Sequence, residues 1–102
     1  MTVLYGIPED REAFRHYYMS THVPIAQRMR GLLRWTLNWV DESDDDAHES
    51  IFLIVDLVAR DRQSMDSILA SPEGQAASAD VKNFATGGVS YFRGYLDDVA
   101  VA

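Results

Sequence analysis

The chain has 102 residues, of which 47% are hydrophobic, and these values predict a single globular domain spanning residues 1–102. Its net charge of −7 argues against nucleic acid as a partner, and its lack of cysteine excludes disulfides and fits a cytoplasmic location. The N-terminus lacks the pattern of a secretion signal, and no apolar stretch approaches the roughly 20 residues that span a bilayer, so no membrane partner is expected.

The N-terminal segment predicts a strand followed by a helix. The apolar run TVLYGI, residues 2–7, is typical of a short strand. Pro8 suits the first position of a helix, and the acidic residues that follow it favour the positive end of the helix dipole. We expect this helix to run to about Ser20.

A histidine and a proline stand where this helix should end. Pro24 has no amide hydrogen, and its ring clashes with the carbonyl of Ser20 in a regular helix. Val23, which precedes the proline, is disfavoured in helical angles. The pattern therefore predicts a break between Ser20 and Pro24, with the imidazole of His22 exposed at the corner and a fresh turn through Arg28.

The middle of the chain predicts two strands joined by an acidic loop. Residues 32–40 alternate between apolar and polar side chains, and residues 50–59 form a nearly continuous β-branched and aromatic run. Residues 41–50 between them, DESDDDAHES, are interpreted as a solvated hairpin loop. Calcium binding is the alternative interpretation, but the loop lacks the ordered spacing of calcium-binding loops.

The second half of the chain predicts a helix and a last strand. Asp61 is placed to cap a helix, and Ser71, followed by Pro72, restarts a helical turn. The glycine pair 87–88 ends the helical pattern, and residues 89–96 form the final strand.

The resulting order is strand, helix, strand, strand, helix, strand, which predicts an α+β fold. This order is typical of the ferredoxin-like sandwich, a four-stranded antiparallel sheet with both helices on one face. Alternation along the third strand points Phe52, Ile54 and Val58 to one face and the apolar residues at 51, 53, 55, 57 and 59 to the other, and the helices can cover only one of these faces. Monomers rarely expose an apolar patch of that kind, so we expect a homodimer joined sheet to sheet.

The aromatic and polar residues of the first helix have two interpretations. Phe14, Tyr18 and His22 share one helical face. In the structural interpretation the histidine caps the helix end and the two rings are core. In the functional one an imidazole and a phenol meet at a pocket, where histidine exchanges protons near neutral pH.

Two motifs resemble one known family. The spacing Phe14-x-x-x-Tyr18-x-x-x-His22-x-Pro24, followed by Gly31, and the stretch SPEGQAASADVKNFATGGV, residues 71–89, are similar to the EthD family of dimeric α+β-barrel proteins. The resemblance covers nearly the whole chain. It implies a small ligand held between helices and sheet. The family is named for a protein required in ethyl tert-butyl ether degradation.

The resemblance favours a site built on His22 and Tyr18 as the catalytic pair. The expected ligand-binding residues are largely aromatic and lie on both helices and strands: Phe14, Tyr5, Trp35, Trp39, Asn83, Phe84 and Tyr91. Aromatic residues at alternating strand positions are equally typical of a core, and Asn83 is equally suited to capping a helix. The scattered histidines predict no metal site, and no phosphate loop or nucleophile elbow is present.

Two functions follow, and a third remains open. The first is a cofactor-free enzyme that acts by proton transfer on a small hydrophobic, oxygen-bearing metabolite, as in cyclisation, isomerisation, retro-addition or cofactor-free oxygenation, with ether or xenobiotic degradation as a setting. The second is a non-catalytic accessory protein that binds the same ligand, with His22 as an anchor. The third is a structural dimer without a ligand.

Overall fold

In the computed structural model of the protein, the structure is described for residues 1–41 and 51–102. The elements in chain order are β1 (Thr2–Gly6), α1 (Arg11–Tyr17), the π-helical turn η1 (Tyr18–His22), α2 (Val23–Ala26), β2 (Arg34–Trp39), β3 (Ile51–Val58), α3 (Arg62–Ala70), α4 (Pro72–Asp80), the 3-10 turn η2 (Val81–Asn83) and β4 (Val89–Phe92). The predicted acidic hairpin loop and the alternative calcium site fall on residues 42–50, apart from Asp41, and these lie outside the described residues.

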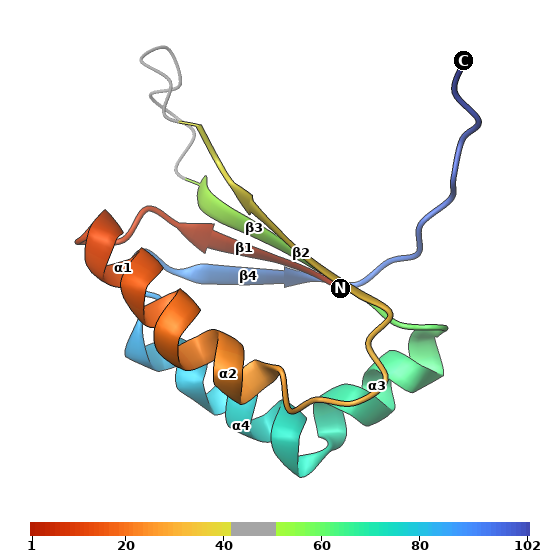
Figure 1. Cartoon of the computed structure of the whole chain (residues 1–102), viewed down its shortest axis with the longest axis horizontal. Helices are drawn as coiled ribbons and strands as arrows, with labels where there is room; N and C mark the ends of the chain where they lie inside the picture. The colour runs from red at the N-terminus through yellow and green to blue at the C-terminus, as the bar shows by residue number, and fades with distance from the viewer. Residues whose placement is uncertain (42–50) are drawn as a thin grey trace.

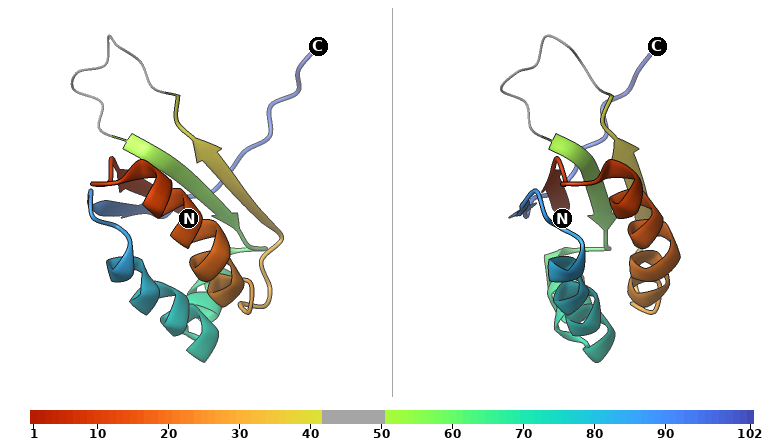
Figure 2. Two further views of the ribbon diagram at one scale, coloured as in Figure 1. Left: turned by 60° about the vertical axis from the view of Figure 1, so that its left-hand side comes forward. Right: turned by 90° about the vertical axis from the view of Figure 1, so that its left-hand side faces the viewer.

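The strands form one antiparallel sheet with the order β2-β3-β1-β4. All helices lie on one face of this sheet, and the α1–α2 segment runs beside α4 (Figures 1 and 2). The predicted α+β architecture is therefore confirmed. Beyond Phe92 the chain leaves the sheet, so the last strand is shorter than the predicted 89–96.

The core lies between the helices and the inner face of the sheet. One row of cross-strand neighbours joins Tyr5, Leu53 and Trp39, and the next joins Val3 and Val55. Leu53 is completely buried, and Tyr5 is 2% exposed. The alternation predicted for the second strand is thus correct, because Trp39 faces the helices with this row.

The predicted orientation of Phe52 is wrong. The register of β1 against β3 shifts between Tyr5 and Gly6, where a bulge interrupts the strict alternation. Phe52 consequently packs on the helix side, with its ring centroid 5.1 Å from that of Phe14. The face without helices is less apolar than predicted, since it keeps Ile54 but not Phe52.

The predicted helix break at Pro24 is also wrong. The chain stays helical from Arg11 to Ala26, and both His22 and Val23 have right-handed helical angles. The turn before the proline widens into a π-helix, in which the amide of Val23 donates to the carbonyl of Tyr18. This wider turn gives room to the proline ring, so the helix continues instead of ending.

The helix starts also differ in part from the prediction. The first helix begins at Arg11 rather than at Pro8, because the side chain of Asp10 accepts a hydrogen bond from the amide of Ala13 and fixes the N-terminus there. The predicted caps at Asp61 and Ser71 are correct.

Gly74 makes the junction of α3 and α4 possible. A Cβ atom at this position would lie 2.2 Å from the carbonyl oxygen of Ile68 and 2.7 Å from that of Leu69. The first turn of α4 therefore packs directly on the backbone at the end of α3, which brings the remainder of α4 beside α2.

Candidate active site between the helices and the sheet

The widened turn η1 places His22 inside the protein. His22 is only 5% exposed, so the expectation of an exposed imidazole at a helix corner is wrong. Its ring lies between two aromatic rings, with centroids 5.0 Å from Tyr18 and 4.7 Å from Phe84. A buried imidazole in such surroundings needs polar partners for its nitrogens.

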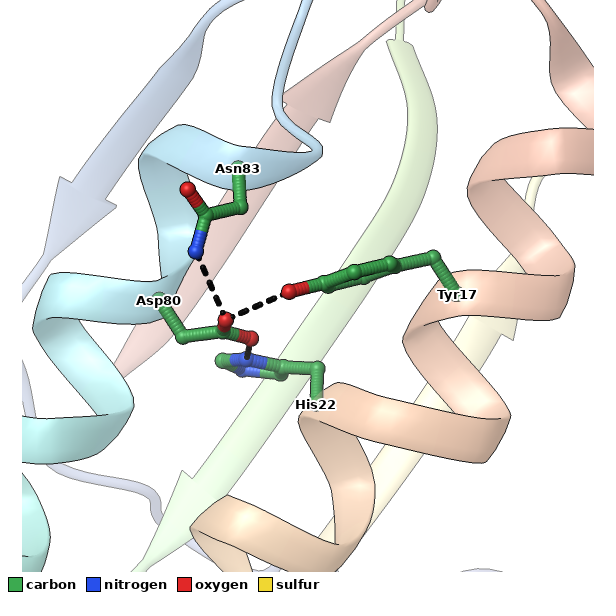
Figure 3. A network of polar contacts seen from close by, with 4 residues as sticks. All are labelled: Tyr17, His22, Asp80 and Asn83. Carbon is green, nitrogen blue, oxygen red and sulfur yellow. Dashed lines mark hydrogen bonds and ion pairs between the residues drawn. The ribbon is translucent and has the colours of Figure 1, made fainter.

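Asp80, at the end of α4, supplies that partner. One oxygen of its carboxylate lies 2.9 Å from Nδ1 of His22. The other oxygen accepts hydrogen bonds from the hydroxyl of Tyr17 at 2.7 Å and from the side-chain amide of Asn83 at 3.0 Å. Figure 3 shows the four residues converging from the two helical segments, with the carboxylate at the centre.

The charges of this network favour a neutral imidazole beside a carboxylate. Burial would raise the pKa of Asp80, but the hydrogen bonds from Tyr17, Asn83 and His22 hold that pKa below its usual value. Burial lowers the pKa of His22 and outweighs the opposing effect of Asp80. At neutral pH the single ring proton of the imidazole is therefore on Nδ1, which donates a hydrogen bond to Asp80. The lone pair of the imidazole is on Nε2.

A cavity lies next to His22, between α2, α4 and the inner face of the sheet. Its volume is about 50 Å³, which is small beside the roughly 300–1,000 Å³ of pockets for drug-sized ligands. Apolar side chains make up most of the lining, together with His22 and four aromatic residues that carry polar groups: Tyr5, Tyr18, Trp35 and Tyr91. Tyr91 is 50% exposed, which places it at the rim of the cavity.

The phenols of the cavity are donors at neutral pH. Burial raises the pKa of Tyr5 and of Tyr18 far above the usual value, and it raises the pKa of Tyr91 as well. The nearby N–H of Trp35 opposes the shift at Tyr18 only in part. These hydroxyls thus stay protonated and can donate hydrogen bonds.

The structure brings together five of the predicted site residues and separates the other four from the cavity. His22, Tyr18, Tyr5, Trp35 and Tyr91 line it. Phe14, Trp39 and Phe84 pack in the neighbouring aromatic core instead, with the ring centroids of Phe14 and Trp39 6.3 Å apart. Asn83 neither lines the cavity nor caps a helix, because its amide donates to Asp80.

Two residues of the network were missed by sequence reasoning. Tyr17 stands next to the more conspicuous Tyr18, and Asp80 lies 58 positions from His22 in the chain. A signal for Asp80 was present, because a carboxylate there falls on the helical face defined by Ala77 and Phe84. A charged residue on an apolar face needs a buried partner.

The described part of the chain offers no other centre of chemistry of this kind. Among residues 1–41 and 51–102, no group of three or more His, Cys, Asp or Glu side chains is placed to hold a metal ion. No helix in these ranges is both long and apolar enough to span a bilayer.

Comparison with known proteins identifies relatives across most of the chain. A family model described as the EthD domain matches residues 8–88. An uncharacterized 11.0 kDa protein from the thcB-thcC intergenic region of Rhodococcus erythropolis is 37% identical over 90 residues, which are 88% of this chain and 86% of that protein.

Solved structures show the same fold. The crystal structure of an ethyl tert-butyl ether D (EthD) family protein from Bacillus halodurans is similar with a TM-score of 0.78 and 26% identity, covering 87% of this chain and 88% of that one. SnoaB, a cofactor-independent oxygenase from Streptomyces nogalater, has a TM-score of 0.55 and 18% identity, covering 95% and 94% of the two chains. The likeness to SnoaB concerns the fold alone.

Proposed function

Because the chain belongs to the EthD family, we propose that it is a small-molecule enzyme in which His22 acts as the base. The observation that carries this proposal is the buried pair of Asp80 and His22 beside a cavity. A carboxylate that fixes Nδ1 of an imidazole and leaves Nε2 free is the arrangement that proton-transfer enzymes use.

The chemistry proposed for this pair is proton transfer to and from a bound ligand. The lone pair on Nε2 of His22 accepts a proton from the ligand, and the resulting imidazolium is stabilised by the adjacent carboxylate of Asp80. The same nitrogen then returns the proton to another atom of the ligand. Neither step requires a metal or an organic cofactor.

The lining of the cavity supports a ligand that is small and mostly apolar. No Lys, Arg, Asp or Glu side chain lines it, and the terminal ammonium of Met1 donates to the carbonyl of Leu57. A ligand that is ionised before reaction would therefore gain no counter-ion from a side chain, and only neutral donor groups would be available to offset the loss of its hydration. A compact, uncharged molecule with one or two oxygen atoms is both small enough and apolar enough for this lining.

A panel of small phenols, lactones and hydroxy acids tests the proposal. In D₂O we expect the parent protein to speed deuterium exchange into at least one ligand, measured by NMR. His22→Ala should reduce that rate by about 10²- to 10⁴-fold, because it removes the proton acceptor.

His16→Ala is the matched control for this experiment, since His16 is exposed on α1 and does not line the cavity. Its exchange rate should equal that of the parent. Equal rates in the parent and in His22→Ala would contradict the proposal. Binding without any exchange would point instead to the accessory function, in which the cavity only holds a ligand.

We also propose that two copies of the chain associate through the sheet face that carries no helix. Leu4, Ile54 and Val58 are half-buried on this face, and Phe92 is 54% exposed. A second sheet stacked on these side chains would remove them from water, which supports a homodimer of the kind predicted from the sequence.

A further inference from the structure

Trp35, a residue of the cavity lining, holds an unused hydrogen-bond donor. Its Nε1 atom is buried and has no hydrogen-bond partner among the described residues. Trp35 itself lines the cavity together with His22 and Tyr18. Leaving a buried N–H unpaired is costly, so a position of this kind indicates a partner that arrives with a ligand.

The neighbouring hydroxyl of Tyr18 adds a second donor at the same place. The N–H of Trp35 lies near enough to the Tyr18 hydroxyl to lower its pKa as a hydrogen-bond donor does, but the contact falls short of the geometry of a full hydrogen bond. Two donors that lie side by side without satisfying each other can both donate to one acceptor placed between them. An oxygen atom that gains negative charge is the acceptor that profits most from such a pair.

We infer that Trp35 Nε1 and the Tyr18 hydroxyl form an oxyanion site, and that the substrate is a small, uncharged carbonyl compound with an acidic C–H next to its carbonyl group. This inference rests on the proposed function, because His22 supplies the base. It adds the class of substrate and the role of Trp35.

The reaction at this site is enolisation, and its atoms balance without a further reactant. Nε2 of His22 takes the proton from the carbon next to the carbonyl, and the electron pair of the broken C–H bond forms a carbon–carbon double bond. The carbonyl electrons move to oxygen, which becomes an enolate oxygen held by Trp35 and Tyr18. The imidazolium then returns the proton to carbon or to oxygen, which completes an isomerisation or tautomerisation.

A phenolate is a stable probe for the enolate oxygen. We choose 4-nitrophenolate, at a pH where the free probe is ionised, and 4-nitrotoluene as its uncharged counterpart of similar shape. Calorimetry on the parent should show tighter binding of the phenolate. Trp35→Phe keeps an aromatic ring and deletes the N–H, so we expect it to weaken phenolate binding by about 10- to 100-fold and to leave 4-nitrotoluene almost unaffected.

Trp39→Phe is the matched control, because Trp39 packs against Phe14 outside the cavity. Phenolate binding should be unchanged in this variant. In the ¹⁵N-labelled parent, the indole N–H resonance that Trp39→Phe leaves in place should move downfield when the phenolate binds. This second measurement does not depend on the folding of Trp35→Phe.

The failure of this inference differs from the failure of the proposed function. Equal phenolate affinity in the parent and in Trp35→Phe, an indole resonance that does not move, or no binding of phenolate to the parent would each overturn the oxyanion site. None of these results concerns deuterium exchange, which depends on His22. Loss of deuterium exchange in Trp35→Phe together with weakened phenolate binding would support both the oxyanion site and the proposed proton-transfer function.

Discussion

The carboxylate of Asp80 decides which nitrogen of His22 carries the proton. Because this carboxylate accepts the proton of Nδ1, Nε2 is left as the acceptor. Tyr17 and Asn83 hold the carboxylate in place from its other oxygen. The choice of the nitrogen with which His22 accepts a proton thus depends on three residues that do not line the cavity.

Asp80→Asn should preserve the shape of this network and reverse its polarity. The amide that replaces the carboxylate offers an N–H to Nδ1, so the imidazole must carry its proton on Nε2 instead. We expect deuterium exchange of the panel ligands to fall by about 10²-fold or more, as for the loss of a base. Circular dichroism should show that the fold is retained.

The same variant should shift the titration of His22. Asp80 raises the pKa of the imidazole against the larger effect of burial, so its removal should lower that pKa further below the ordinary 6.5. NMR titration of the imidazole protons measures this shift. Asp97→Asn removes an equal charge from the exposed C-terminal segment and should leave the titration unchanged. A rise in Asp80→Asn would contradict the assigned pair.

At the residue scale, local patterns predicted half of the site. Helical spacing was enough to place Tyr18 and His22 on one face, because that spacing survives the widened turn. Asp80 reaches His22 only through tertiary packing, and no local pattern specifies which residue it will contact. Trp39 was expected in the site with Trp35, but the helix face of β2 extends beyond the cavity to the aromatic core.

At the element scale, the junction of α3 and α4 depends on the missing side chain of Gly74. Gly74→Ala should destabilise the protein by about 1–3 kcal/mol, because the added methyl group would overlap the carbonyls of Ile68 and Leu69. Helix propensity alone predicts the opposite, a gain of about 1 kcal/mol. Chemical denaturation measures which effect dominates.

Ala76→Gly is the comparison for this prediction, since Ala76 is exposed in the same helix. It should lose about 1 kcal/mol through propensity. A gain of stability in Gly74→Ala would show that the two helices are free to move apart, which contradicts the close packing described for this junction.

Elements were predicted more reliably than their irregularities. Period and capping residues identified each strand and helix, since these signals are local. The β-bulge at Phe52, opposite Gly6, and the π-turn at Tyr18–His22 were not predicted. Each is a local irregularity that the surrounding packing maintains. One extra residue in a strand or in a helical turn barely changes the sequence pattern, so neither irregularity can be predicted from that pattern.

At the scale of the whole molecule, the sheet face without helices should join two copies. We expect sedimentation to show a dimer at micromolar concentration, with roughly 2,000 Å² or more of surface buried in total. Ile54→Arg places a charge in the middle of this face and should yield a monomer. Gln75→Arg, on the exposed side of α4, should stay dimeric.

A monomeric parent would contradict the dimer without affecting the cavity, which is lined within one chain. If the parent is a dimer, deuterium exchange by the monomeric Ile54→Arg variant shows whether the site works in a single chain. Retained exchange in the monomer would separate association from chemistry.

The π-turn also has a consequence for how related sequences should align. A turn closed between Tyr18 and Val23 holds one residue more than an α-helical turn, so it is equivalent to a single inserted residue. Removing the exposed Met19 would restore an ordinary helix and rotate every later side chain relative to every earlier one. Relatives with and without the histidine–aspartate pair should accordingly differ by a one-residue gap at this point of an alignment, so that gaining or losing the site requires a change of length rather than a change of fold.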